Sequence, residues 1–189
     1  MGIIVTGFEP FGGAEVNASW EAVRRLDGVE RILLPVSFAA AVKGIRGLAG
    51  RGIDAVICVG VAGGRWAISV ERVAVNLMDA RMPDNDGARP VDAPVVPGGP
   101  AAYFSTLPTR RIAARLEEAG IPAELSCTAG TYVCNAVFYA LMDAVARSGR
   151  PIPAGFIHVP VRGMPTETIA AGLRIAVEEV KRLGGGTMI

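Results

Sequence analysis

Residues 55–59, Ala55-Val56-Ile57-Cys58-Val59, form a continuous run of apolar side chains of strand length. Such a run is typical of a strand in a parallel sheet, because a parallel sheet is covered on both faces and its strands need no polar side. The run is the strongest single indication of the fold, and it predicts a buried parallel sheet.

Strand-like and helix-like runs alternate on both sides of this segment. Strands are predicted at residues 3–6, 31–35, 55–59, 123–126 and 155–159, and helices at 19–26, 38–49, 109–119, 132–148 and 166–183. Asn17 or Ser19 is expected to cap the first helix and Ser37 the second, while three glycines close the last. The alternation predicts the α/β class, as a three-layer α/β/α sandwich with a mostly parallel, mixed twisted sheet, in a single domain over residues 1–189.

The alternation breaks between residues 60 and 100. Residues 66–76 predict a β-hairpin or an extended arm, whereas residues 79–100 are rich in proline, glycine, aspartate and asparagine. The second segment is predicted to be a long loop, and long loops within compact domains are usually functional or mobile.

Composition argues against several classes of partner. The chain has a formal net charge of +1 and no basic stripe or acidic tail, so nucleic acids and anionic membranes are not expected to bind. Its apolar runs are too short to span a bilayer, and its first residues lack the features of a secretory signal. Met1-Gly2 fits a loose myristoylation pattern, but the strand predicted directly after it would hide an acyl chain.

The three cysteines are widely spaced and form no C-x-x-C motif. No metal site is therefore expected. An odd number of thiols suits a reducing compartment, and the predicted location is cytoplasmic. Cys58, inside the apolar run, is predicted to be a small buried apolar residue.

Two residues could carry nucleophilic and acid–base chemistry. His158 is the only histidine, and it lies near the carboxyl end of a predicted strand, where open α/β sheets place their sites. Cys134 lies in the first turn of a predicted helix, whose dipole would lower the pKa of the thiol and whose N–H groups could bind an oxyanion. A cysteine packed at a strand–helix junction and a core histidine with satisfied hydrogen bonds are the alternatives.

A third side chain would be needed to orient the imidazole. The candidates are Glu71, Asp79, Asp84 and Asp86. Glu71 stands among apolar residues in an alternating strand pattern, so its carboxylate needs a partner. The neighbouring Arg72 would point to the opposite face of such a strand. A surface acid on an edge strand is the alternative for Glu71.

The loop after the first strand reads Gly7-Phe8-Glu9-Pro10-Phe11-Gly12-Gly13. A glycine-rich loop here suggests phosphate binding, yet neither G-x-G-x-x-G nor a Walker lysine is present. Phe8 and Phe11 are predicted to line a flat apolar pocket, with packing of the loop onto the core as the alternative.

Together these segments resemble the pyroglutamyl peptidase type I family, also called pyrrolidone-carboxylate peptidases, which are cysteine peptidases. The motifs that carry the resemblance follow in chain order at residues 5–13, 57–60, 62–65, 71–76, 79–81, 83–85, 99–104, 128–135 and 155–160. The resemblance implies hydrolysis of the bond after an N-terminal pyroglutamyl residue of peptides, without a metal or cofactor. It also implies a homo-oligomer, either a tetramer or a dimer.

The resemblance implies roles for individual residues as well. Cys134 matches the nucleophile, His158 the base and Glu71 the acid that orients the imidazole. Arg81 and the backbone N–H of Cys134 would bind the oxyanion. Phe8 and Phe11 would form the aromatic walls that hold the pyroglutamyl ring, and Asn17 would support them. A backbone group at Val133 would bond the lactam, and Val61 is one further pocket position.

Two positions depart from the family pattern. Val61 stands where family members usually carry glutamine, so one polar contact near the substrate is lost, worth about 0.5–1.5 kcal/mol. Ala18 stands where proline is usual after Asn17, which affects the entry to the helix. The region after Pro160 is also shorter than in many relatives.

Two other functions stay open. The change at Val61 is compatible with a non-catalytic or altered-specificity pyroglutamyl-binding protein on the same scaffold. A phosphorylase-like nucleoside enzyme would bind phosphate at Gly12-Gly13 and would give Cys134 no role.

Overall fold

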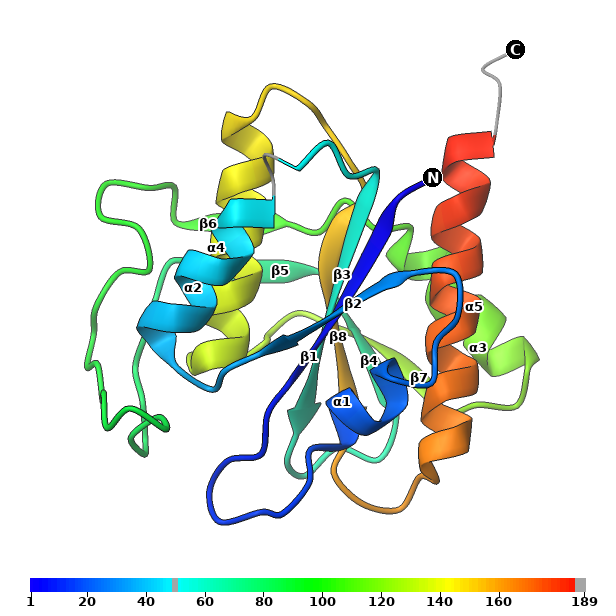
Figure 1. Ribbon diagram of the computed structural model, residues 1–189, viewed down its shortest axis with the longest axis horizontal. Coiled ribbons are helices and arrows are strands. Elements are labelled where there is room, and N and C mark those ends of the chain that lie inside the picture. Colours follow the sequence, from blue (N-terminus) through cyan, green and yellow to red (C-terminus); the bar gives the residue numbers. More distant parts are fainter. Residues whose placement is uncertain (49–50, 186–189) are drawn as a thin grey trace.

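The computed structural model describes residues 1–48 and 51–185, and its elements follow the predicted alternation (Figure 1). The strands are β1 (Ile3–Phe8), β2 (Glu30–Leu34), β3 (Ala55–Ala62), β4 (Ile68–Glu71), β5 (Val73–Val75), β6 (Ala102–Phe104), β7 (Ala123–Ser126) and β8 (Ala154–Pro160). The helices are α1 (Ala18–Val23), α2 (Phe38–Leu48), α3 (Thr109–Glu118), α4 (Val133–Arg147) and α5 (Thr166–Gly185).

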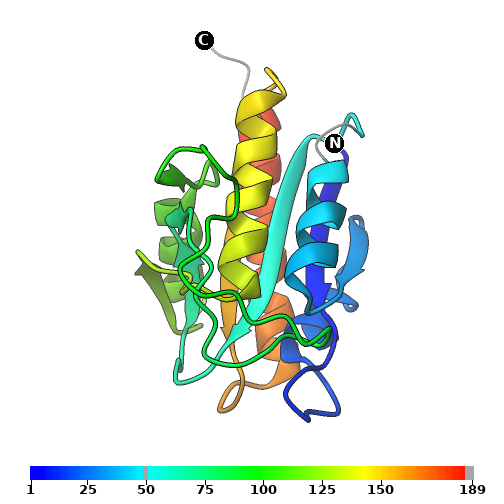
Figure 2. The ribbon, with the colours of Figure 1, turned by 90° about the vertical axis from the view of Figure 1, so that its left-hand side faces the viewer.

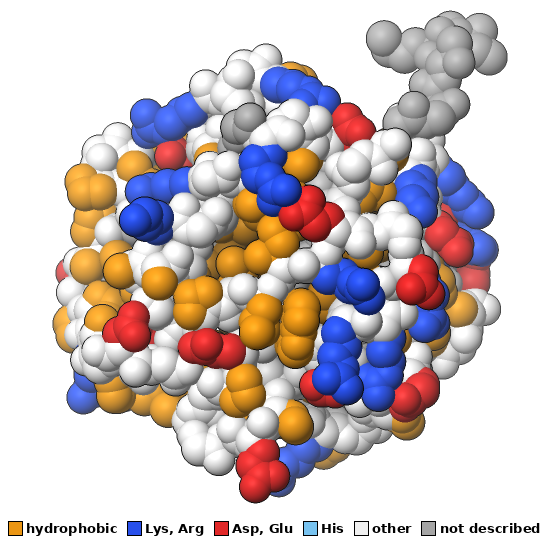
Figure 3. Space-filling view, viewed as in Figure 1, with side chains coloured by type: hydrophobic (Ala, Val, Ile, Leu, Met, Phe, Trp, Pro, Cys, Tyr) orange, Lys and Arg blue, Asp and Glu red, His pale blue; other side chains and the backbone are white. Residues whose placement is uncertain are grey.

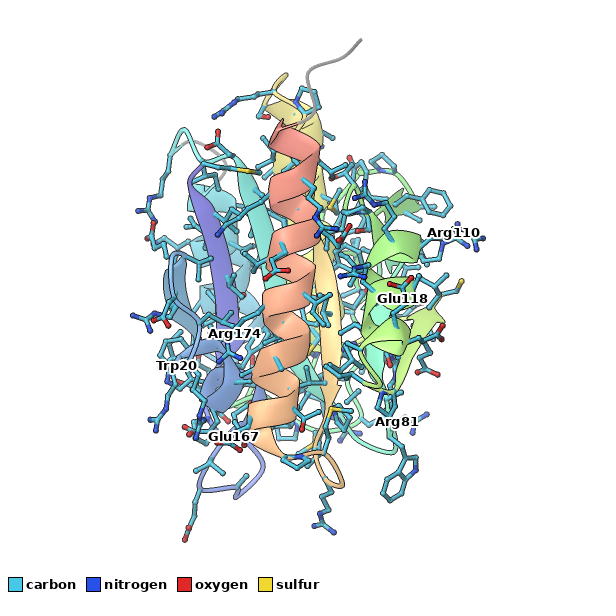
Figure 4. The ribbon with its side chains drawn as sticks, turned by 90° about the vertical axis from the view of Figure 1, so that its right-hand side faces the viewer. Trp20, Arg81, Arg110, Glu118, Glu167 and Arg174 are labelled. Atoms are coloured by element: carbon cyan, nitrogen blue, oxygen red, sulfur yellow. The ribbon has the colours of Figure 1, made fainter. Side chains whose placement is uncertain are left out.

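Six strands form one sheet in the order β2-β1-β3-β8-β4-β7, in which β4 and β7 run opposite to the other four. Helices α2 and α4 cover one face, and α1, α3 and α5 cover the other (Figures 1 and 2). In Figure 4, α5 lies lengthwise over the second face with α3 beside it. The predicted three-layer sandwich with a mostly parallel, mixed sheet is confirmed.

The side chains of β3 alternate between two apolar cores, because successive residues of a strand point to opposite faces. Val56 and Cys58 belong to the core under α2 and α4, whereas Ala55, Ile57 and Val59 belong to the core under α1, α3 and α5. The apolar run at residues 55–59 therefore supplies both cores, and the predicted burial of Cys58 is confirmed.

The predicted hairpin or extended arm at residues 66–76 is wrong. β4 lies inside the main sheet between β8 and β7, and β5 pairs with β6 in a separate two-stranded sheet. Ile68 and Val70 on β4 are buried in the core under α1, α3 and α5, which a hairpin on the surface would not allow. The other face of β4 carries Glu71 into the interior, so Glu71 is not a surface acid on an edge strand.

The predicted helix caps are confirmed. Asn17 is the N-cap of α1, and its side chain accepts a hydrogen bond from the Ser19 N–H. The Ser37 hydroxyl accepts one from the Ala40 N–H in the first turn of α2. The predicted end of α2 at residue 49 lies outside the described residues. Helix α5 runs two residues further than predicted, to Gly185.

The long loop between β5 and β6 is attached to α2 through Asp84. One carboxylate oxygen of Asp84 accepts a hydrogen bond of 2.8 Å from the Phe38 N–H, in the first turn of α2, and the other accepts from the Asp86 and Ala88 N–H groups. These bonds fix the loop and satisfy an N–H that the helix itself leaves free. Asp84 therefore holds the loop in place, and its carboxylate contacts α2 rather than His158.

Among the described residues, no helix is both long and apolar enough to cross a membrane. On the face in Figure 3, Lys and Arg side chains are interspersed with Asp and Glu. At the end of α1, Arg24 and Arg25 both pair with Glu21. This face presents no continuous surface of one charge.

Candidate active site

The sheet brings His158 and Glu71 together although 87 positions separate them. His158 follows Phe156 on the face of β8 that packs under α4, and Ser69 of the antiparallel strand β4 pairs with His158. Glu71 lies on the same face of β4 as Ser69, two residues on. The result is a hydrogen bond of 2.8 Å between His158 Nδ1 and Glu71 Oε1, with Glu71 fully buried and His158 only 3% exposed.

This hydrogen bond determines which nitrogen of His158 can act as a base. A carboxylate only accepts hydrogen bonds, so Nδ1 must carry a proton and donate it, which leaves Nε2 of the neutral ring with its lone pair free. Burial lowers the pKa of His158, although the hydrogen bond to Glu71 and its charge oppose that change. The neutral imidazole, with Nε2 as an acceptor, is thus the favoured form in the free protein.

Arg65 binds the same carboxylate oxygen and was not assigned a role from the sequence. Its Nη1 donates to Glu71 Oε1 at 2.6 Å, and its Nη2 donates to the Thr128 carbonyl at 2.7 Å. The guanidinium therefore joins the β3–β4 connection to Glu71 and to the loop that leads into α4. Its charge contributes to the lowered pKa of His158.

Cys134 occupies the second position of α4, directly above the sheet. Gly60 on β3 makes room for it, because a Cβ atom on Gly60 would lie 2.8 Å from Cys134 Sγ. Tyr132 is the N-cap of α4 and, among the described residues, gives the helix no side-chain cap hydrogen bond. Serine, threonine, aspartate and asparagine usually fill that position, so the first N–H groups of α4 stay available to a ligand.

The predicted lowering of the Cys134 pKa is wrong. Cys134 is partly buried, and removal of the thiol from water raises its pKa to about 12, with the Glu71 carboxylate adding to the increase. Burial disfavours the thiolate more than the start of the helix favours it. The raised pKa of the thiol and the lowered pKa of His158 favour a neutral thiol beside a neutral imidazole. Within the part of the chain that the structure describes, no hydrogen bond joins the two.

Both groups face one cavity of about 240 Å³ at the carboxyl ends of β1, β3 and β8. All five predicted substrate-contact residues line it together with Cys134 and His158: Phe8, Phe11, Asn17, Val61 and Val133. Arg65, Tyr132 and Val36 line it as well. An apolar cavity with a few polar groups at one end is the usual form of a small-molecule site.

Comparison with known proteins identifies the family of this site. The sequence profile described as pyroglutamyl peptidase matches residues 1–182. The chain belongs to the pyroglutamyl peptidase family. Among curated relatives, the pyrrolidone-carboxylate peptidase of Thermococcus kodakarensis is 48% identical over 95% of this chain and 96% of its own length. That of Bacillus subtilis is 45% identical over 97% of each chain.

Solved structures of the family have the same fold. The pyroglutamyl peptidase I from Bacillus amyloliquefaciens superposes with a TM-score of 0.91 at 42% identity, over 94% of this chain and 93% of that one. A mutant pyrrolidone carboxyl peptidase (E192V) from Pyrococcus furiosus gives a TM-score of 0.91 at 39% identity, over 97% and 99%. The chain therefore has the fold of this family.

The aromatic lining of the cavity includes a residue beyond the predicted pair. Tyr132 packs against Phe11 and Phe38 at centroid distances of 6.2 and 5.3 Å, and its hydroxyl donates to the Pro83 carbonyl. Asn17 donates to the Glu9 carbonyl, which ties the loop of Phe8 and Phe11 to the start of α1. Tyr132 was missed because the sequence placed it inside the helix rather than at its N-cap.

Arg81 lies apart from the lining of the cavity. Its neighbour Asp79 is bound through its backbone to Thr131, just before α4, but Arg81 is exposed and does not line the cavity. Figure 4 places Arg81 towards the lower end of the molecule. Its contact with an oxyanion stays a prediction, whereas Arg65 is the arginine that the cavity contains.

Proposed function

We propose that this chain hydrolyses the peptide bond that follows an N-terminal pyroglutamyl residue, with Cys134 as nucleophile, His158 as base and Glu71 as the acid that orients it. The observation that carries the proposal is an apolar cavity that contains the thiol and an imidazole hydrogen-bonded to a buried carboxylate. Membership of the pyroglutamyl peptidase family supports the choice of substrate.

The chemistry of the ring fits this cavity. A pyroglutamyl residue has no ammonium group, so a site for it needs apolar walls and amide hydrogen bonds rather than a carboxylate. Phe8, Phe11 and Tyr132 supply the walls. Backbone groups around Val133, at the start of α4, would bond the lactam.

The proposed reaction begins from the neutral pair. The Cys134 sulfur attacks the carbonyl carbon after the ring while His158 Nε2 takes the thiol proton, and the oxyanion forms against the backbone N–H of Cys134, with Arg81 as a second candidate donor. The C–N bond then breaks as His158 returns the proton to the leaving amine. His158 then deprotonates a water that attacks the thioester carbon, and as the C–S bond breaks it passes that proton to the Cys134 sulfur, which releases pyroglutamic acid and restores the neutral pair.

The direct test is release of an aminocoumarin from its pyroglutamyl derivative, with and without iodoacetamide. Alkylation is expected to abolish turnover. Turnover that is insensitive to the alkylating agent would refute the thiol mechanism. If the protein binds pyroglutamate in calorimetry but does not cleave the substrate, it is instead a non-catalytic binding protein, the alternative function with which Val61 is compatible. The implied homo-oligomer is a separate part of the proposal, and light scattering tests it.

The pH dependence of kcat/KM should depend on Arg65. Because burial and Arg65 lower the pKa of His158, the base stays neutral on acidification until the pH falls below its ordinary value of about 6.5. The acid limb of wild-type kcat/KM is expected below that pH. Arg65→Gln removes a nearby cation, so the His158 pKa rises and the limb moves to higher pH. Arg46→Gln on α2 removes one exposed charge that does not line the cavity and should leave the limb in place. Equal shifts in both variants would contradict the assignment.

Val61→Gln should restore the polar contact that family members usually make. One hydrogen bond contributes about 0.5–1.5 kcal/mol, so KM is expected to fall by about two- to tenfold with little change in kcat. Val61 lines the cavity and is only partly buried, which leaves space for the longer side chain. Val91→Gln, on the exposed loop, is the matched control. An unchanged KM in Val61→Gln would mean that this position makes no contact with the ring.

A further inference from the structure

A second depression, of about 630 Å³, opens beside the catalytic cavity. The two are continuous, because Phe11, Asn17, Val61 and Gly63 line both. The far side of this groove is formed by the β1–α1 loop and the β8–α5 loop, and neither Cys134 nor His158 lines it. The groove therefore adjoins the catalytic cavity without containing either reacting group.

The groove collects exposed apolar side chains. Nine large hydrophobic side chains are exposed among the described residues, and three of them line this one groove: Val16 (64% exposed), Met82 (44%) and Val161 (49%). Trp66, 75% exposed, borders a smaller depression that shares Val161. Exposed apolar side chains that gather around a cavity indicate a binding surface, whereas isolated ones do not.

Acidic side chains accompany this apolar surface. Glu15 and Glu21 line the groove, and Glu21 is paired with Arg24 and Arg25 of its own helix. Among the described residues, Glu15 is in no ion pair, so its charge acts directly on whatever occupies the groove. A carboxylate in the groove would be repelled.

We propose that this groove binds the side chain of the residue after the pyroglutamyl group and selects an apolar one over a polar or acidic one. The inference rests on the proposed function. The catalytic cavity, at about 240 Å³, is smaller than the roughly 300 Å³ at which ligand pockets usually begin, so it holds the ring and little else. With the scissile carbonyl at Cys134, the rest of the peptide has to leave the cavity, and this groove is the larger of the two depressions that share lining residues with it.

The test compares three amidated peptides, pyroglutamyl-Leu-Gly, pyroglutamyl-Ser-Gly and pyroglutamyl-Asp-Gly, in competition, with cleavage followed by mass spectrometry. Partial burial of a leucine side chain in an open groove corresponds to a preference of about tenfold in kcat/KM over serine. The aspartyl peptide should be cleaved most slowly, and Glu15→Gln should raise its cleavage alone by about two- to threefold.

Variants on opposite sides of the groove locate the preference. Val16→Ser and Val161→Ser should each reduce the leucine-to-serine ratio by about threefold, because each lowers kcat/KM for the leucyl peptide more than for the seryl peptide. Val91→Ser, an equally exposed valine outside the groove, should leave the ratio intact. Equal rates for leucine and serine in the wild type, or an equal loss for both peptides in Val161→Ser, would overturn the inference. Failure of the wild type to cleave any of the peptides would overturn the proposed function itself.

Discussion

Replacing Cys134 with alanine is expected to lower kcat/KM for a pyroglutamyl aminocoumarin by at least about 10⁴-fold, because loss of the nucleophile of a catalytic triad removes the covalent route altogether. Cys134→Ser should be nearly as inactive. A serine hydroxyl is a weaker acid than a thiol, and the same burial that raises the thiol pKa to about 12 would hold its proton more firmly still.

The control for this substitution is Cys127→Ser. Cys127 is a free and exposed cysteine that does not line the cavity, so its removal should change kcat/KM by less than about twofold. Iodoacetamide should still inactivate Cys127→Ser. Cys134→Ala should still bind pyroglutamate in calorimetry, which separates loss of chemistry from loss of folding. Near-normal turnover by Cys134→Ala would rule out the thioester mechanism.

Most of the sheet could be predicted because its strands carry local signals. Ile57, in the middle of an apolar run, indicates a buried strand without knowledge of its neighbours. Residues 68–71 carry an equally clear alternation, but alternation does not specify the partner strand. Ser69 pairs with His158, and Ile68 with Ala123. These partners lie far along the chain, so the sequence could not distinguish an internal strand from a hairpin.

The candidate site could be predicted in part for the same reason. An acid among apolar residues needs a partner, which pointed to Glu71 before its contact with His158 was known. Arg65 gave no such signal, because its role depends on reaching Thr128 across 63 positions. The pKa of Cys134 was mispredicted because the start of a helix is visible in the sequence, whereas the depth at which the thiol lies is not.

His158→Ala is expected to lower kcat/KM by about 10⁴-fold or more, and Glu71→Gln by less, about 10²-fold. Removal of the imidazole leaves the Cys134 proton with no acceptor. Removal of the Glu71 charge keeps the base and weakens only its orientation and the stabilisation of its charged form.

Arg65 makes the comparison with glutamine informative. Its Nη1 donates to the same Oε1 atom that accepts from His158 Nδ1. Glutamine at position 71 would therefore place its amide oxygen at the position of Oε1, where both donors point. Its NH₂ group would take the position of Oε2, which has no hydrogen-bond partner among the described residues. The oxygen would still accept from Nδ1, so the ring would keep Nε2 free for the thiol proton.

This orientation depends on the arginine, so the double variant Arg65→Gln/Glu71→Gln should lose more activity than the product of the two single losses. Without Arg65 the amide can turn its NH₂ group towards Nδ1, which favours the tautomer that protonates Nε2 and blocks proton transfer. Steady-state kinetics of the two single variants and the double variant measure this coupling. Equal losses in Glu71→Gln and His158→Ala would mean that the carboxylate does more than orient the ring. Strictly multiplicative losses in the double variant would mean that Arg65 does not hold the amide.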